Sequence, residues 1–193
     1  VFGSLDLNVI SNLNLYFSLF IDEINTDDFF DPRKSRKQVG VTLGFQTYDL
    51  LLENLEFAAE YSRLNPWVYS HRFTASNFTN NSYDLGHWVG QNGDDLYFDL
   101  NYSPSRALKI GAFTEVYRKG GSLDVSFQYG LDTPPFLYGP MHEERSIGLY
   151  GRYQPLRDLF IDFQARRWTV QDEVISSLNR DKNFEFFIGA SLG

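Results

Sequence analysis

The sequence predicts an all-β protein, an antiparallel transmembrane β-barrel. Short segments alternate strictly between apolar and polar residues, which is typical of strands with two different faces. Long polar connections and short turns follow one another along the chain, as in outer-membrane barrels. Aromatic residues make up 17% of the 193 residues, with 18 Phe and 12 Tyr. Together these features favour strands that expose one face to lipid.

The alternation is clearest over 12–22, where Leu13, Leu15, Phe17, Leu19 and Ile21 share one face. Segments of about ten residues match the length of a tilted membrane-spanning strand. The predicted strands are 1–9, 12–22, 38–49, 55–65, 96–102, 108–117, 147–153, 159–166 and 184–192.

Long and short connections alternate between these strands. Tight turns are expected near Ser11, Leu52, Pro104 and Pro155, and would face the periplasm. Long external loops are expected at 23–37, 64–94, 118–143 and 171–182.

A soluble β-sandwich would also alternate, but its polar face would be rich in Lys, Glu and Thr. Here the second face is rich in Gly and mixes aromatic residues with charges. That composition suits a barrel lumen with paired charges rather than a surface in water. The charged positions are Asp99, Glu115, Arg152, Asp162 and Arg166.

The two ends of the sequence suggest part of a larger barrel. We count eight full strands and a partial first one, whereas bacterial single-chain barrels have an even number of strands. Segment 1–9 would also enter the membrane from the external side, so the sequence would begin in the middle of a barrel. The last strand keeps its apolar phase if an aromatic residue follows Gly193. We therefore expect 1–193 to be the C-terminal part of a single barrel domain, with further N-terminal strands as its partner and a signal peptide upstream.

Composition excludes several other classes. There is no cysteine, so disulfide scaffolds, Cys-zinc sites and Cys nucleophiles are ruled out. A net charge of -8 argues against a nucleic-acid partner, which needs clustered Lys and Arg. The sequence contains no run of about 18 apolar residues, so it predicts no transmembrane helix.

The stretch 60–95 stands apart from the strands. It reads EYSRLNPWVYSH, then FTNNSYDLGHWVGQNGDDLY after six residues, and lacks apolar periodicity. These segments resemble the Wzi-like capsule assembly family of outer-membrane β-barrels. The matching residues are Glu60, Tyr61, Ser62, Arg63, Asn65, Pro66, Trp67, Tyr69, His71, Leu85, Gly86, His87, Gly90, Asn92, Asp94, Asp95 and Leu96, whereas Trp88 stands where the family pattern has Pro.

The resemblance implies an eighteen-stranded barrel at the cell surface that binds capsular polysaccharide as a lectin, without catalysis or cofactor. Flat aromatic faces and planar polar groups are suited to sugar rings, and Asn80, Asn81 and Tyr83 add to them. Turn formation and internal hydrogen bonding within the loop explain many of the same residues. The candidate ligand-binding residues are Glu60, Arg63, Asn65, Trp67, Tyr69, His71, His87, Trp88, Asn92 and Asp94.

Other functions stay open on the sequence alone. The loops could constrict a channel or porin. A lipid hydrolase could use His71 with Ser70, or His87 with Asp84, although no Gly-x-Ser-x-Gly motif is present. The neighbouring carboxylates Asp94 and Asp95 could serve a glycosidase, but consecutive side chains diverge in direction.

Two charged clusters suggest further partners. Oxygen ligands for Ca²⁺ could come from the acidic loop residues, but the spacing of an EF-hand is missing and we expect no metal. The basic run 33–37 could contact lipopolysaccharide phosphates in the outer membrane, or be solvated. The acidic residues are Asp22, Glu23, Asp27, Asp28, Asp31, Asp94 and Asp95.

Overall fold

The computed structural model of the chain describes residues 1–24, 37–49, 52–70, 79–80, 83–121, 134–175 and 181–192. The described residues contain strands and turns, and no helix among them is long and apolar enough to cross a membrane. The strands are β1 (Phe2–Ile10), β2 (Leu13–Ile24), β3 (Lys37–Tyr48), β4 (Leu55–Leu64), β5 (Thr79–Asn80), β6 (Tyr83–Asp84), β7 (Gly93–Ser105), β8 (Leu108–Lys119), β9 (His142–Leu156), β10 (Leu159–Asp172) and β11 (Asp181–Leu192).

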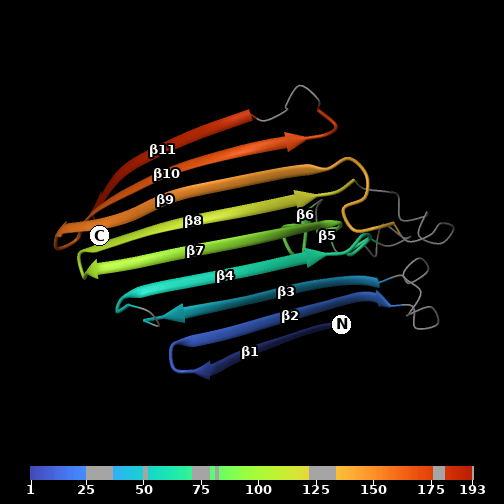
Figure 1. Cartoon of the computed structure of the whole chain (residues 1–193), viewed down its shortest axis with the longest axis horizontal. Coiled ribbons are helices and arrows are strands. Elements are labelled where there is room, and N and C mark those ends of the chain that lie inside the picture. The colour runs from blue at the N-terminus through green and yellow to red at the C-terminus, as the bar shows by residue number, and fades with distance from the viewer. Residues whose placement is uncertain are drawn as a thin grey trace.

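Nine strands form one antiparallel sheet in the order β1-β2-β3-β4-β7-β8-β9-β10-β11, and β5 pairs with β6 in a second sheet of two strands (Figure 1). Within the large sheet each strand therefore pairs with the strands of that sheet that precede and follow it in the sequence, as in an up-and-down meander. This confirms the prediction of an all-β antiparallel fold. Within the described residues the sheet is not closed, and β1 and β11 are its edges.

The strand register aligns the alternating apolar positions of neighbouring strands on one face. Leu15 pairs with Phe45, Phe45 with Ala59, and Ala59 with Phe98. At the other edge of the sheet, Phe163 pairs with Ile188 and Ala165 with Phe186. Because side chains alternate at every residue, a slip by one would turn a whole strand over. The observed register is the one that makes a continuous apolar face.

Connections separate to the two ends of the sheet (Figure 1). The end that carries the long connections, after β2, β4, β8 and β10, is called the loop end here; the short connections lie at the turn end. Two predicted turn positions were wrong: Pro104 lies inside β7 and Pro155 inside β9, and the turns follow at 106–107 and 157–158. At Pro104 the register with β8 shifts, so its missing N–H removes no regular ladder bond.

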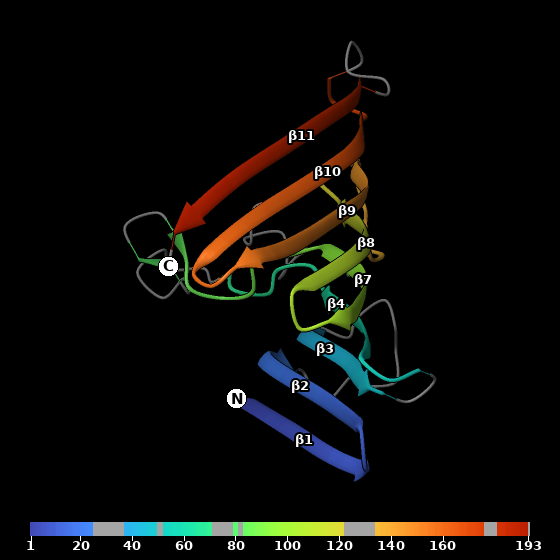
Figure 2. The same ribbon diagram turned by 90° about the vertical axis from the view of Figure 1, so that its left-hand side faces the viewer.

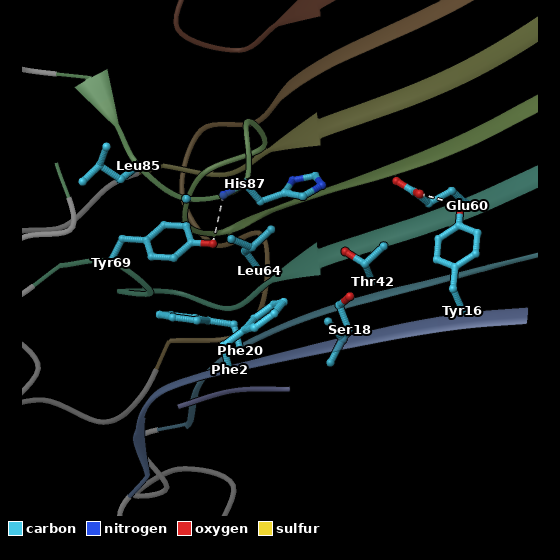
Figure 3. Close-up of a pocket in the computed structure, with 13 residues that line it drawn as sticks. Phe2, Tyr16, Ser18, Phe20, Thr42, Glu60, Leu64, Tyr69, Leu85 and His87 are labelled. Carbon is cyan, nitrogen blue, oxygen red and sulfur yellow. Dashed lines mark hydrogen bonds between the residues drawn. The ribbon is translucent and has the colours of Figure 1, made fainter. Parts of the chain in front are cut away.

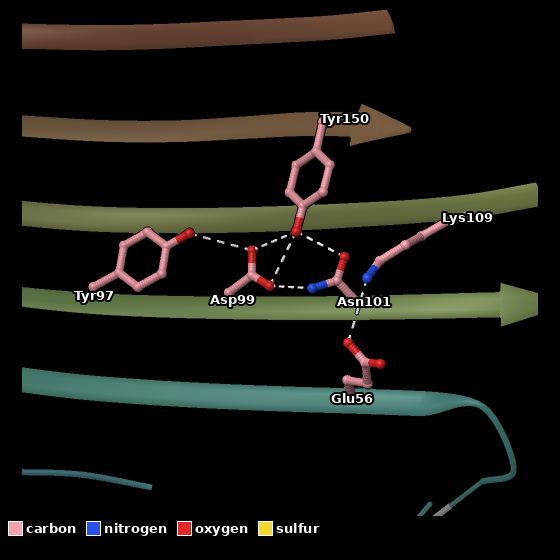
Figure 4. A network of polar contacts seen from close by, with 6 residues as sticks. All are labelled: Glu56, Tyr97, Asp99, Asn101, Lys109 and Tyr150. Atoms are coloured by element: carbon pink, nitrogen blue, oxygen red, sulfur yellow. Dashed lines mark hydrogen bonds and ion pairs between the residues drawn. The ribbon is translucent and has the colours of Figure 1, made fainter. Parts of the chain in front are cut away.

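The sheet is curved, and the described parts of the long connection between β4 and β7 lie on its concave side (Figure 2). The concave face carries the polar side chains of the alternating strands. Near its middle the Tyr150 hydroxyl donates to Asp99 at 2.7 Å (Figure 4). Tyr97 and Asn101 also donate to Asp99. Beside this cluster Lys109 pairs with Glu56 at 3.4 Å. Such paired groups are consistent with the predicted mixture of charge and aromatic rings on this face.

The convex face is apolar and exposed. Ile147, Leu149, Phe184, Phe186 and Ile188 are each 59–70% exposed. Soluble monomers rarely expose an apolar surface that runs across many strands. The buried hydrophobic core lies instead on the concave side, beneath the long connection.

Candidate functional site on the concave face

The connection between β4 and β7 folds back onto the concave face, where it builds a small core. Val68 and Val89 are fully buried, and Leu64 and Tyr69 pack with them, against Phe20 of β2. These apolar side chains have no regular spacing in the sequence, so periodicity could not reveal them. Their burial holds the described parts of the connection, 65–70 and 85–92, against the sheet.

Tyr69 is fixed by three separate contacts. Its backbone N–H donates to the Asp22 carboxylate at 2.9 Å, and its ring packs on Phe20 with centroids 5.1 Å apart. Its hydroxyl accepts the backbone N–H of His87 at 3.0 Å. Tyr69 thereby joins the two described halves of the connection and forms one wall of a cavity.

The cavity has a volume of about 530 Å³ and lies between this connection and strands β2, β3 and β4 (Figure 3). Polar groups and aromatic rings line it together, which is the usual composition of a small-ligand site. Its side chains include Tyr16, Ser18, Phe20, Thr42, Glu60, Tyr69, Leu85 and His87.

Glu60 supplies the carboxylate of this cavity. Its Oε2 accepts the Tyr16 hydroxyl at 2.6 Å, so one carboxylate oxygen is held in place from β2, two strands away on the same face. The Tyr16 ring lies over Gly44, where any Cβ would overlap it. Sequence reasoning placed Glu60 among the candidates but missed Tyr16, whose only signal was its position on the polar face of its strand.

His87 points toward Glu60 across the cavity (Figure 3). Its Nδ1 lies 3.3 Å from the backbone N–H of Val89 and can accept that hydrogen, which leaves Nε2 as the hydrogen-bond donor of a neutral ring. Burial lowers the pKa of His87 below its usual value, and the negative charge of Glu60 opposes this only in part. A neutral donor opposite a carboxylate acceptor suits hydroxyl groups, which can both accept and donate.

Trp88, the next residue, remains 61% exposed and has its ring 5.1 Å from that of Tyr117. It lines a second concave-face cavity of about 410 Å³ with Glu115, Tyr117 and Arg166. Arg166 lies 3.7 Å from Glu115, so this cavity also offers both signs of charge. The adjacent residues His87 and Trp88 therefore line two different cavities of the concave face.

Other predicted ligand residues lie on the convex side of the loop end. Asp94, only 1% exposed, accepts two hydrogen bonds from the Arg118 guanidinium at 2.9 and 2.5 Å and one from the Tyr61 hydroxyl at 3.0 Å. Arg63 stacks on the Phe136 ring at 3.9 Å, and its Nε donates to Asn65. These internal contacts engage Arg63, Asn65 and Asp94 away from both cavities.

Asn92 and Trp67 are buried. The Asn92 amide donates to the carbonyls of Gly121 at 2.8 Å and Tyr138 at 3.2 Å, and its oxygen accepts the Leu137 N–H at 2.8 Å. Trp67 is 2% exposed, which leaves little of its ring open to a ligand. The structure thus divides the described part of the predicted set: Glu60, Tyr69, His87 and Trp88 face the cavities, and the rest lie buried or bonded within the loop end. The latter are Arg63, Asn65, Trp67, Asn92 and Asp94.

Some predicted residues lie outside what the structure describes, namely His71, Asn81 and the side chains of Asn80, Tyr83 and Asp84. Ser70, the nucleophile considered beside His71, donates its hydroxyl to Gln91 at 3.2 Å. Among the described residues, no three His, Cys, Asp or Glu side chains gather closely enough to hold a metal ion.

A search of models of known protein families gave no match to the chain, and a search of curated protein sequences gave none either.

Gly86 gives a direct test of the cavity wall. A Cβ at this position would overlap the Tyr69 ring, although its backbone φ does not require glycine. We expect Gly86→Ala to displace the ring and lower the free energy of unfolding by about 1–3 kcal/mol. Urea unfolding of the protein in detergent micelles measures this, with Gly3→Ala as control because Gly3 has open space around it. Equal stability of the two variants would contradict the described packing.

Proposed function

We propose that this chain is part of a transmembrane β-barrel of the bacterial outer membrane, and that its concave side binds a surface polysaccharide without catalysing a reaction. The observation that carries the proposal is the division of one curved sheet into two faces. The convex face is apolar and exposed, and the concave face is polar and hollowed by two cavities.

The membrane part rests on the convex face. An exposed apolar surface of this extent has a natural partner in lipid, which requires that all backbone groups be paired within the sheet. The order of strands, the short turns at one end and the long connections at the other are those of outer-membrane barrels. Further strands paired to β1 and β11 would close the sheet and satisfy both edges.

The ligand part rests on the concave face. Sugar rings offer hydroxyls for carboxylate, phenol and imidazole groups, and C–H faces for aromatic rings. Glu60 and His87 supply such polar groups in the first cavity, and the exposed Trp88 ring supplies a flat surface beside the second. A polymer rather than a single sugar would be needed to occupy both hollows at once. The resemblance of 60–95 to the Wzi-like capsule assembly family points to capsular polysaccharide.

Trp88 provides the sharpest test of polysaccharide binding. We expect Trp88→Ala to weaken retention on immobilised capsular polysaccharide about tenfold, since one aromatic stacking surface is lost from the site. Retention of the full-length protein in detergent micelles on a panel of such polymers measures the effect. Phe186→Ala is the matched control, because it removes a ring that is 60% exposed on the convex face.

Two results would overturn the proposal. Unchanged retention of Trp88→Ala would remove the concave face as the binding site. No retention of the wild-type protein on any polymer, combined with steady ion conductance in planar bilayers, would assign the protein to the channels instead.

A further inference from the structure

The convex face carries a depression of about 460 Å³ that spans β7, β8, β9 and β10. Small side chains alternate there with large ones across the paired strands. Ala112 lies between Leu100 and Leu149 in the register, and Ala165 lies between Leu149 and Phe186. The small residues leave a hollow in a face that is otherwise filled by large apolar groups.

The lining of this depression is almost entirely hydrocarbon. Thr114 is a polar residue in it, but its Oγ1 donates to the Ser146 carbonyl at 3.0 Å, so its hydrogen-bonding need is met by the backbone. Phe98, Leu149 and Phe184 supply large apolar surfaces around it. A hollow of this composition fits a flexible hydrocarbon chain better than any polar ligand.

Arg167 lines the depression on the side of the loop end. Its side chain is exposed, and within the part of the chain that the structure describes it has no ion-pair partner. Arg145 is its diagonal neighbour, because Arg167 pairs with Ile147 and Arg145 with Thr169. Arg145 is 64% exposed and bonds Glu143 at 2.6 Å, so the two guanidinium groups together retain one uncompensated positive charge.

The height of Arg167 on the sheet matches a lipid headgroup. Leu159 lies next to the turn, and the eight residues from it to Arg167 span about 26 Å along the strand at roughly 3.3 Å per residue. At a strand tilt of about 40° this is about 20 Å across the membrane, close to the apolar band of about 25 Å in such barrels. The guanidinium would thus stand where hydrocarbon ends and phosphates begin.

We propose that this depression is a specific site for an anionic, phosphate-bearing membrane lipid. One acyl chain lies in the hollow over Ala112, Thr114 and Ala165, and the phosphate lies against Arg167 with Arg145 beside it. Guanidinium groups bind phosphate oxygens through paired hydrogen bonds, which gives the site its preference for charge. The inference rests on the proposed membrane location but is independent of polysaccharide binding.

The test measures bound lipid on the full-length protein by native mass spectrometry. The delipidated protein in neutral detergent is titrated with dimyristoyl phosphatidylglycerol, and with the zwitterionic dimyristoyl phosphatidylcholine as the comparison lipid. We expect a first equivalent of the anionic lipid to bind in preference, and Arg167→Gln to weaken it about fivefold through the loss of one charge. Ala165→Trp, which fills the hollow but keeps the face apolar, should weaken both lipids. Arg157→Gln is the control, because Arg157 is 92% exposed at the turn end.

Equal binding of the anionic lipid to wild-type protein, Arg167→Gln and Ala165→Trp would overturn the site. Displacement of the lipid by millimolar inorganic phosphate would also overturn it, since the acyl chain would then contribute nothing. If the wild-type protein is retained on polysaccharide but binds no lipid, the lipid site fails alone. If the protein is not recovered from the membrane fraction, the proposed location fails with it.

Discussion

Replacing Asp94 by Ala is expected to lower the free energy of unfolding by about 3 kcal/mol, since removal of one partner of a buried ion pair leaves the other uncompensated. Asp94 is 1% exposed and accepts hydrogen bonds from Arg118 and Tyr61. The Arg118 side chain is 39% exposed, which lets water replace part of the lost interaction and places the effect at the lower end for such pairs. Urea unfolding in detergent micelles measures the change. The folded fraction is read from gel electrophoresis, in which the compact, unheated protein migrates faster than the unfolded one.

Asp162→Ala is the matched control for this prediction. Asp162 also accepts two hydrogen bonds from one guanidinium, at 2.6 and 3.2 Å from Arg152, but this pair lies open to solvent. Exposed pairs contribute little to stability, so the control variant should unfold close to the wild type. If Asp94→Ala is no less stable than Asp162→Ala, the buried cluster at the loop end does not hold the strands together. Asp94→Asn should fall between them, because the amide keeps an acceptor for Tyr61.

The strands could be predicted from the sequence because each one carries its own signal. Alternation within 12–22 or 55–65 fixes which face a residue takes, and apolar matching then fixes the register between neighbours. The exact turn positions were less accessible. Pro104 and Pro155 were placed in turns because proline is common there. Pro104 instead lies within β7, where the register shifts, and Pro155 lies one residue before the end of β9.

The candidate site could be predicted only in part, because it depends on contacts between distant segments. The residue types of 60–95 identified the segment, but burial of Val68 and Val89 brings Tyr69 and His87 against β2 and β4. No local pattern distinguishes Trp67, which is buried, from Trp88, which is exposed. Likewise Tyr16 and Glu60 are 44 residues apart, and only the order of strands makes them neighbours.

Replacing Asn92 is expected to release the segment 134–141 from the connection between β4 and β7. The Asn92 side chain binds two carbonyls and one N–H of the segments around Gly121 and Tyr138, and its own carbonyl accepts the Gly120 N–H at 2.8 Å. Asn92→Ala keeps the backbone bond to Gly120 but leaves the Gly121 and Tyr138 carbonyls and the Leu137 N–H without their side-chain partner. Each unsatisfied buried group costs about 1–3 kcal/mol, and because water replaces part of the lost bonding we expect a loss of about 3 kcal/mol in all. Hydrogen exchange at the Leu137 and Gly121 amides should accelerate accordingly.

The backbone of Asn92 lets the hydrogen bonds be separated from conformational strain. Its φ is 54°, a region that Asn and Gly adopt more readily than Ala. Asn92→Gly should therefore lose the same hydrogen bonds but retain about 1 kcal/mol more stability than Asn92→Ala. Asn92→Asp keeps the shape but turns a carboxylate oxygen toward two carbonyls, and should release the segment as fully as Ala does. Asn14→Ala is the control, since its amide bonds only exposed side chains of β1. Unchanged exchange at Leu137 in all three Asn92 variants would mean that the stacking of Phe136 on Arg63 is enough to hold the segment in place.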